Sequence, residues 1–296
     1  MLDLENNKES ELVVILVNYN GLSDTIECIR SIKQSSVKSK IVVVDNASKQ
    51  NESLAINELF PDVQTFRSEQ NLGFAGGNNV GIKWALENKF KYIALLNNDT
   101  IIERNMFEKL LQHAARDCAV APFMYYYSSP QKIWFGGGEV NKIKGNPEHF
   151  DKEKDGCFRC SFLTGCCFLM HRDIWESIGL LDELYFMYHE DTDYSIRLIQ
   201  NGISLMVVPE AKLYHKVGKS SGDRQSAFSI YYNTRNRILI LRKYKSFFYP
   251  TAYIFTLMSR TMRMLMLALK GRSEWKAFYS GMRDALKGMT GISWLN

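Results

Sequence analysis

The sequence predicts an α/β fold: a mostly parallel, doubly wound sheet with helices on both faces, followed by a helical C-terminal extension. Two runs in the first half of the chain, Leu12–Val17 and Ile41–Val44, are continuously apolar and rich in β-branched residues, as strands buried on both faces are. Helical patterns alternate with such runs up to Leu96, and this alternation is typical of a parallel sheet. The chain has 296 residues, 46% of them hydrophobic, which is ample for a packed core.

The first half divides into short elements that can be placed from the residue pattern. Ser23 or Asp24 is a candidate N-cap for a helix that carries Ile26, Ile29 and Ile32 at helical spacing. In chain order, the predicted elements are a strand at 12–17, a helix from 23 or 24 to 33, a strand at 41–44, a helix at 51–60, a strand at 63–67, a glycine-rich turn at 71–79, a helix at 77–88 and a strand at 92–96.

Beyond Asp99 the pattern is looser. The polar stretch at 141–155 predicts a long loop, and loops of this length in compact domains are usually functional or disordered. The other elements predicted for this half are a helix at 104–115, a strand at 161–170 interrupted by Gly165, a short helix at 173–178, a helix beginning near 190 and ending before Gly202, and a strand at 204–208.

Three buried strands in succession end in small polar or acidic side chains: Asn18-Tyr19-Asn20, Asp45-Asn46 and Asn97-Asn98-Asp99. Ligands of doubly wound sheets bind beyond the carboxyl ends of the strands. One such group alone would suit a turn or a helix cap, but three together favour a ligand cleft. The turn at 71–79 precedes a helix, where backbone N–H groups can face an anion, but its glycine spacing does not match the dinucleotide fingerprint.

An acidic cluster, Glu190, Asp191 and Asp193, begins the predicted helix that ends before Gly202. The structural interpretation is strong, because acids in the first turn complement the positive end of a helix, and Asp193 forms an i,i+4 pair with Arg197. The chemical interpretation is that one of these carboxylates is a base in a reaction. The cluster alone leaves both interpretations open.

The last sixty residues are strongly basic. From Arg235 to the end there are twelve Lys or Arg and two acids, a net charge of +10, so the preceding 234 residues carry −5 of the total of +5. Phe247–Leu269 is apolar, but Arg260 and Arg263 near its middle argue against a membrane span and favour an interfacial amphipathic helix. We expect residues 246–290 to contact an anionic membrane surface. The alternatives are a helical lid or a surface for homo-oligomers, and no motif indicates nucleic acid.

The first eleven residues form a polar tail with four acids and no apolar segment. This pattern matches neither a signal peptide nor a transit peptide. Together with the basic extension, it leads us to expect a cytoplasmic protein, peripheral at the inner face of the cell membrane.

Six motifs, taken in order, resemble the family-two inverting glycosyltransferases, and most of all the rhamnosyltransferase-type enzymes of bacterial surface polysaccharide synthesis. They are Val17–Gly21, Val44–Ser48, Asn71–Asn78, Leu96–Thr100, Gly165 with Gly179–Glu183, and Glu190–Asp193, and the resemblance covers about residues 12–222. It implies a GT-A fold at 12–234, with a nucleotide-binding half at 12–100 and an acceptor half at 101–234, before the basic helical extension at 235–296. It also implies transfer of a sugar from a nucleotide-diphosphate donor, dTDP-rhamnose first and a UDP-sugar second, to a glycan or lipid-linked acceptor.

The resemblance also implies the donor site. Asp45 would accept the imide N–H of the base, Tyr19 would help to hold the base or ribose, and Asp99 with His215 would bind Mg²⁺ or Mn²⁺ at the diphosphate. Asn97 stands where the family's motif often has its first Asp, so a single carboxylate remains there. The remaining donor-binding residues implied in this way are Asn18, Asn20, Asn46, Gly76, Asn78, Asn97 and Asn98.

For the reaction itself, the resemblance implies that Asp191 is the base that takes the proton of the acceptor hydroxyl. Glu190 and Gly165 would lie at the acceptor, while Asp193 with Arg197 would brace the helix. A helix start is expected to keep Asp191 ionised. Two alternatives are a non-catalytic nucleotide-sugar-binding or assembly subunit, suggested by Asn97, and a nucleotidyltransferase, which lacks the glycine-rich and basic start that such enzymes use.

Overall fold

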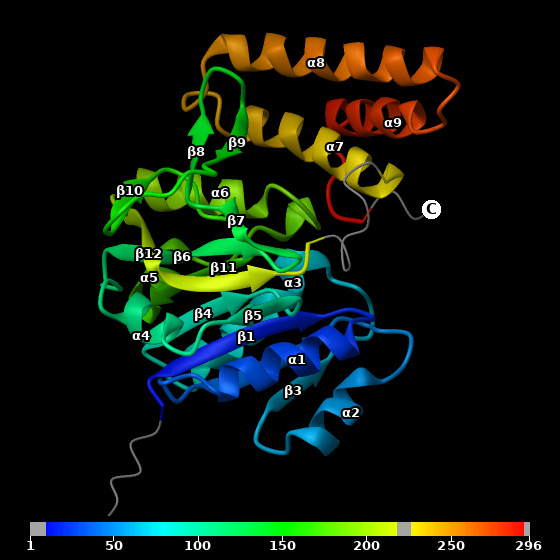
Figure 1. Cartoon of the computed structure of the whole chain (residues 1–296). Helices are drawn as coiled ribbons and strands as arrows, with labels where there is room; N and C mark the ends of the chain where they lie inside the picture. The colour runs from blue at the N-terminus through cyan, green and yellow to red at the C-terminus, as the bar shows by residue number, and fades with distance from the viewer. Residues whose placement is uncertain (1–9, 218–225, 293–296) are drawn as a thin grey trace, which may run out of the picture.

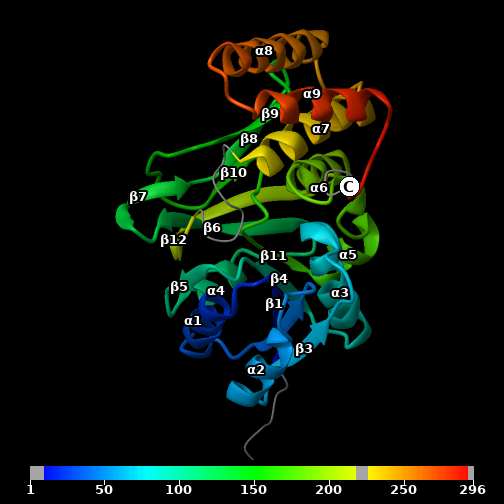
Figure 2. The same ribbon diagram turned by 90° about the vertical axis from the view of Figure 1, so that its right-hand side faces the viewer.

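The computed structural model describes residues 10–217 and 226–292. Most of the predicted tail at 1–11 therefore lies outside the described residues. The described chain forms an α/β body with a layer of C-terminal helices on one side, and Figures 1 and 2 show the two parts in perpendicular views. The predicted fold class is confirmed by a central sheet whose strands run in the order β10-β12-β6-β11-β4-β1-β2-β3.

The first half of the sheet is parallel throughout. β1 (Leu12–Asn18) lies between β2 (Lys40–Asp45) and β4 (Tyr92–Leu96), and β3 (Gln64–Arg67) pairs with β2. The inner strands are buried on both faces, which explains their continuous runs of Val, Ile and Leu. All four strands therefore end at one edge of the sheet, as predicted.

The helices of this half differ from their predicted bounds at the N-terminal ends. α1 (Leu22–Lys33) has Gly21 as its N-cap, without a side-chain cap from Ser23 or Asp24. α3 (Gly73–Glu87) begins inside the predicted glycine-rich turn. Its early start places small residues against β1, since a Cβ on Gly77 would come within 2.8 Å of Val17 Cγ1. α2 (Glu52–Leu59) lies close to its predicted position.

The second half adds antiparallel pairs, so the whole sheet is mixed. β11 (Cys167–His171) lies antiparallel between β4 and β6 (Cys118–Tyr126), and β12 (Ser204–His215) runs parallel to β6. β12 is longer than the predicted 204–208, because it continues past an irregularity between Val208 and Lys212 to His215. The other elements of this half are β5 (Thr100–Ile102), α4 (Met106–Leu111), β7 (Ser129–Phe135), β10 (Phe158–Cys160), α5 (Arg172–Ile178) and α6 (Glu190–Gln200).

The long loop predicted at 141–155 is wrong in its first part. β8 (Gly138–Asn141) and β9 (Asn146–His149) form an antiparallel hairpin there. The polar composition of this hairpin masked its strands. It extends from the sheet to the C-terminal helices, where a Cβ on Gly145 would meet Leu241 and Ala252.

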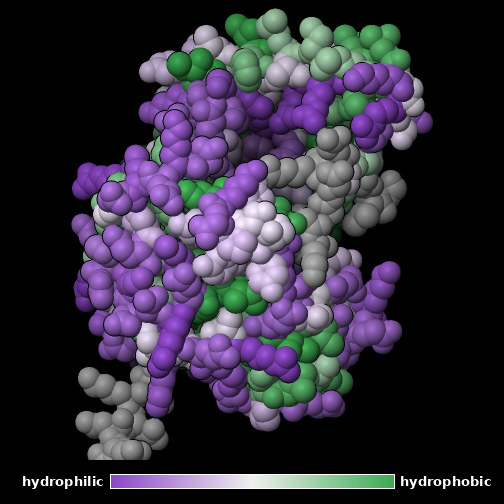
Figure 3. Space-filling view, in the orientation of Figure 1, coloured by the Kyte–Doolittle hydropathy of each residue, from purple (hydrophilic) through white to green (hydrophobic). Residues whose placement is uncertain are grey.

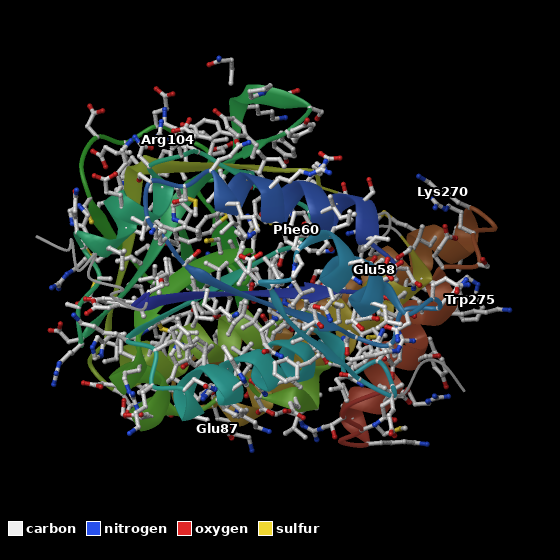
Figure 4. The ribbon with its side chains drawn as sticks, turned by 90° about the horizontal axis from the view of Figure 1, so that it is seen from below. Glu58, Phe60, Glu87, Arg104, Lys270 and Trp275 are labelled. Atoms are coloured by element: carbon white, nitrogen blue, oxygen red, sulfur yellow. The ribbon has the colours of Figure 1, made fainter. Side chains whose placement is uncertain are left out.

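The C-terminal layer consists of α7 (Ala227–Lys243), α8 (Pro250–Leu269) and α9 (Trp275–Leu286). The predicted boundary between 234 and 235 falls inside α7, so the helical layer begins earlier than expected. A separate apolar cluster joins this layer to the segment before α6, and it contains Phe186, Ile230, Tyr231, Tyr232, Ala277 and Phe278. Figure 4 shows from below that the α8–α9 turn, marked by Lys270 and Trp275, extends past the edge of the α/β body.

The apolar side chains of α8 are largely exposed. Met258 is 67% exposed and Leu269 is 88% exposed, and of the twenty residues of the helix only Ala252 and Thr256 are buried. Figure 3 shows hydrophobic residues gathered over α8 at the top of the molecule. None of the helices in the described ranges is long and apolar enough to cross a membrane.

Candidate active site

The polar residues that end β1 and β4 share one buried hydrogen-bond network. Asn18 Nδ2 donates to Glu52 Oε2 at 2.7 Å, and Asn18 Oδ1 accepts from Thr25 Oγ1 at 2.8 Å. Asn98 Nδ2 donates to the same Thr25 hydroxyl at 2.8 Å. A Cβ on Gly21 would come within 2.9 Å of Asn98 Nδ2, so glycine permits the close approach of the two loops. Asn18 and Asn98 therefore fix the geometry of the strand ends.

Tyr19 and Asn20 lie at the rim of this edge. Tyr19 is 46% exposed, so its ring is available to a base or ribose. Asn20 has a left-handed φ of 53°, a conformation that Asn tolerates better than most residues. Its Oδ1 accepts from the backbone N–H of Lys49 at 2.8 Å, which ties the β1 loop to the β2 loop.

Asp45 is fully buried at the end of β2 and already has two partners. Its Oδ1 accepts from the backbone N–H of Ser48 at 3.0 Å, and its Oδ2 accepts from Arg67 Nη1 at 2.5 Å. Since the side chain of Asp45 is fully buried, its bond to a base stays a prediction. Sequence analysis missed Arg67, although it ends the neighbouring parallel strand and so reaches the same edge of the sheet.

Asn46 links this edge to the start of α3. Its Nδ2 donates to the backbone carbonyl of Gly73 at 3.0 Å, and its Oδ1 accepts from the N–H of Leu72 at 2.9 Å. Gly73 has a φ of 72°, and a Cβ there would lie 2.1 Å from Phe186 O, so only glycine fits. The Phe74 N–H donates to the same carbonyl at 2.8 Å. Asn46 therefore positions the loop that meets the segment before α6.

The other two predicted donor residues of this region lie within α3. Asn78 Nδ2 donates to the Phe74 carbonyl at 2.9 Å, so its amide is used inside the helix. A Cβ on Gly76 would come within 2.7 Å of Leu72 Cβ. Both residues pack the first turns of α3 tightly.

Asp99 and His215 converge from β4 and β12. His215 Nε2 lies 3.1 Å from Asp99 Oδ1, and both side chains are buried. The Trp134 ring packs edge-on against His215 with the centroids 4.4 Å apart. Asn97 is partly exposed beside them, with its N–H donated to the Cys166 carbonyl at 2.8 Å. A carboxylate oxygen, an imidazole nitrogen and an amide thus occupy one corner of the site.

This corner fits a divalent cation that takes its remaining ligands from a bound substrate. Within residues 10–217 and 226–292, no group of three or more His, Cys, Asp and Glu side chains is arranged to hold a metal ion alone. Mg²⁺ commonly takes one or two carboxylates from the protein and the remaining oxygens from a substrate phosphate. Asp99 provides one carboxylate of that kind, and His215 adds an imidazole nitrogen.

Asp191 lies in the first turn of α6 and faces Gly165. Its Oδ2 accepts from the Gly165 N–H at 3.1 Å, and its Oδ1 accepts from the Thr192 N–H at 2.7 Å. A Cβ on Gly165 would lie 2.9 Å from the Phe74 ring and 3.7 Å from Asp191 Cβ. Glycine therefore lets the backbone reach the carboxylate. The next residue, Cys166, accepts a hydrogen bond from the Asn97 N–H. Gly165 and Cys166 therefore connect Asp191 to the polar residues that follow β4.

Burial changes the protonation of the two adjacent acids. It raises the pKa of Asp191 despite the lowering effect of the bonds from Gly165 and Thr192. The helix start was expected to keep Asp191 ionised, but burial opposes this because it favours the neutral acid. The pKa of Glu190 is raised well above its usual value by burial and then by the charge of Asp191. Glu190 Oε2 is buried and has no hydrogen-bond partner in the described chain. Burial and the charge of Asp191 therefore favour the protonated form of Glu190.

The turn before Asp191 has strained backbone angles and is held by hydrogen bonds from α7. Phe186, Tyr188 and His189 have φ values of 64°, 67° and 73°, which bulky residues rarely adopt. Asn236 of α7 holds this turn, because its Nδ2 lies 2.8 Å from the Met187 carbonyl and 2.9 Å from the Tyr188 carbonyl. Sequence analysis missed Asn236, since nothing near it in the sequence indicates this contact.

Asp193 is structural, as predicted. Its Oδ2 accepts from Arg197 Nε at 2.9 Å, and its Oδ1 accepts from Lys243 Nζ at 2.6 Å, Tyr244 Oη at 2.8 Å and Tyr185 Oη at 3.1 Å. This carboxylate is fully buried and joins α6 to the end of α7.

The sheet, the polar strand ends and the acid at the start of α6 together define a glycosyltransferase of the GT-A fold. A structure titled GalNAc-T7 with UDP, GalNAc and Mn²⁺ matches with a TM-score of 0.63 at 19% identity, covering 78% of this chain and 47% of that one. The mannosyltransferase PcManGT from Pyrobaculum calidifontis, in complex with GDP-Man and Mn²⁺, matches with a TM-score of 0.60 at 12% identity, over 93% of this chain and 87% of that one. At these identities the likeness concerns the fold.

The sequence match is more specific. Residues 13–179 match the family described as Glycosyl transferase family 2, and the chain belongs to this family. A relative named dTDP-rhamnosyl transferase RfbF, from Shigella flexneri, is 22% identical over 245 residues, which cover 79% of this chain and 81% of the relative.

Proposed function

We propose that this glycosyltransferase inverts the anomeric carbon of a nucleotide-diphosphate sugar as it transfers the sugar to a hydroxyl group of an acceptor. The observation that carries the proposal is the placement of Asp191. Its carboxylate accepts a hydrogen bond from the Gly165 N–H, and the next residue, Cys166, accepts one from the Asn97 N–H, close in sequence to Asp99. An inverting transfer needs one base opposite the leaving group and no covalent nucleophile. Asp191 is the carboxylate that the arrangement provides for this role.

The proposed roles follow the geometry of the site. Asp45, Tyr19 and the strand-end amides bind the nucleoside, and Asp99 with His215 lies at the diphosphate. Mg²⁺ or Mn²⁺ bound there would offset charge on the departing diphosphate. Asp191 accepts the proton of the acceptor hydroxyl as its oxygen attacks the anomeric carbon. Glu190, which favours its protonated form, can donate a hydrogen bond to the acceptor, and the Gly165 N–H holds the base in place.

The donor proposed first is dTDP-rhamnose, with UDP-sugars second. It is supported by the name of the Shigella flexneri relative and by the sequence motifs, which also suggest a role in bacterial surface polysaccharide synthesis. The acceptor would be a glycan or a lipid-linked sugar. A non-catalytic nucleotide-sugar-binding subunit is the second candidate, since Asn97 leaves only one carboxylate at the metal corner.

Turnover distinguishes the two candidates. The protein should release nucleoside diphosphate from dTDP-rhamnose, or from one of a panel of UDP-sugars, when a saccharide acceptor is present. EDTA should lower this rate at least about tenfold, because charge on the leaving diphosphate is then no longer offset, and Mn²⁺ should restore it. Tight binding of the donor without release of nucleoside diphosphate for any acceptor would favour the non-catalytic subunit.

We also propose that residues 246–290 contact an anionic membrane surface, which would place the protein peripherally at the inner face of the cell membrane. The net charge of +10 from residue 235 onward and the exposed apolar side chains of α8 support this. Flotation with phosphatidylglycerol vesicles, but not with phosphatidylcholine vesicles, is the expected result. Absence of flotation together with a dimer in light scattering would instead make α8 a surface between two copies of the chain.

A further inference from the structure

Three arginines on α7 and α8 lie close together. They are Arg237, Arg260 and Arg263, and no carboxylate of residues 10–217 and 226–292 contributes to the electrostatics of Arg237 or Arg260. Burial, and then the charges of Arg237 and Arg263, lower the pKa of Arg260 to about 9. Arg260 therefore stays charged at neutral pH, inside a group of like charges that folding alone does not favour.

The guanidinium groups of this cluster are only partly satisfied. Arg237 Nε donates to the Gly145 carbonyl at 3.0 Å, and Arg237 Nη2 donates to the Lys144 carbonyl at 2.5 Å and to Asn146 Oδ1 at 3.3 Å. Arg260 Nε, in contrast, is buried and lacks a hydrogen-bond partner among the described residues. The centroid of the Phe278 ring lies 5.9 Å from the guanidinium carbon of Arg260. A buried donor usually has a partner, so Arg260 Nε is available to donate to an anionic ligand.

The cluster lies next to the turn that presents Asp191. Burial, followed by the charges of Arg237 and Arg260, lowers the pKa of His189 to about 3. His189 directly precedes Glu190 and Asp191 and is the N-cap residue of α6. An anion held by the arginines would therefore lie near the candidate base, on the side of the C-terminal helices.

The outer side of the same helix is apolar. The exposed large side chains of α8 are Ile254, Phe255, Leu257, Met258, Met262, Leu265, Met266 and Leu269. Figure 3 shows this hydrophobic surface above a recessed hydrophilic one. A ligand that matches both surfaces has a strongly anionic group attached to a hydrocarbon chain.

We propose that Arg237, Arg260 and Arg263 bind the diphosphate that links an acceptor sugar to a lipid, with the hydrocarbon chain along the exposed face of α8. Guanidinium groups bind phosphate oxygens with paired, charge-assisted hydrogen bonds. The sugar attached to such a diphosphate would reach the turn at His189–Asp191. This inference rests on the proposed function and specifies its acceptor as a lipid diphosphate-linked saccharide. A phospholipid headgroup offers similar chemistry but has no sugar to place at the base.

A binding measurement tests the site without turnover. Isothermal titration of farnesyl diphosphate should be done in EDTA, so that no divalent cation recruits the diphosphate to Asp99. Arg260→Gln should weaken binding at least about tenfold, while Asp99→Asn and Arg104→Gln leave it unchanged. Arg104 is exposed and lies on the opposite side of the molecule from the α8–α9 turn (Figure 4). Equal affinity of the wild type and Arg260→Gln would overturn the proposal.

Thermal unfolding separates a ligand site from a structural role. Arg260→Gln removes one of three adjacent positive charges and should raise the Tm in the absence of ligand. Farnesyl diphosphate should raise the Tm of the wild type but not that of the variant, because a ligand stabilises only the state that it binds. A fall in Tm on substitution would show that Arg260 supports the fold.

The acceptor form then tests the position of the site. With a prenyl diphosphate-linked saccharide, Arg260→Gln should raise KM at least about tenfold, whereas with the same saccharide on a neutral alkyl chain the wild type and the variant should have equal KM. Equal KM for both acceptors, with vesicle flotation lost in the variant, would assign the arginines to lipid headgroups and overturn the proposal. Failure to transfer the sugar to either acceptor would instead count against the proposed function. The binding of farnesyl diphosphate would still show whether the three arginines bind a diphosphate.

Discussion

Asp191→Asn is expected to reduce kcat by about 10³-fold, within the 10²–10⁴-fold range typical for a general base. The amide has no basic oxygen that can take the proton of the acceptor hydroxyl. The substitution also replaces one of the two carboxylate oxygens, and both of these accept hydrogen bonds, one from the Gly165 N–H and one from the Thr192 N–H. We expect the donor affinity to change little, since Asp45, Tyr19 and Asp99 are untouched.

The measurements are kcat and KM by release of nucleoside diphosphate, and the donor Kd by titration calorimetry. Glu58→Gln is a matched control, because Glu58 is an exposed acid near the end of α2. Full activity in Asp191→Asn would remove the role assigned to this residue. Lost donor binding would show instead that the substitution disturbs the cleft.

The same carboxylate sets a pH dependence. Burial raises the pKa of Asp191, and only its ionised form can act as a base. Activity should therefore be complete above this raised pKa and fall as the pH decreases through it. The acid limb of kcat/KM should lie above about 3.9, the value of an unperturbed Asp.

Asp193→Ala is expected to lower the free energy of unfolding by about 3–5 kcal/mol, the cost of breaking a buried ion pair. Arg197 and Lys243 would each lose a carboxylate partner, and the hydroxyls of Tyr185 and Tyr244 would lose their acceptor. The side chain of Asp193 is fully buried, so water cannot readily replace these bonds.

Urea unfolding followed by circular dichroism measures this loss. Asp117→Ala serves as the control, because Asp117 is an exposed acid before β6, and its free energy of unfolding should change by less than about 0.5 kcal/mol. Similar stability of both variants would mean that the α6–α7 connection contributes little. A large loss for Asp193→Ala alone would show that the C-terminal helices support the turn that presents Asp191.

Much of the α/β body was predictable from local sequence. The strands β1 and β2 are continuous apolar runs, and such runs are legible because burial on both faces leaves no polar position. The hairpin of β8 and β9 was missed for the opposite reason, since its strands carry Asn, Glu and Pro and are only partly buried. The strand ends at Asn18, Asp45 and Asp99 were found because parallel strands end at one edge.

The sequence by itself determined the order of strands and helices, the polar edge of the sheet and the acidic start of α6, because each is encoded by residues adjacent in the chain. Only the tertiary structure decided which side chains contact each other. Arg67 meets Asp45 across 22 positions, and Asn236 meets Tyr188 across 48. It also decided that Arg237 and Arg260 lie together beside His189. Such contacts depend on which elements pack against each other, and burial then sets the charge that each side chain carries.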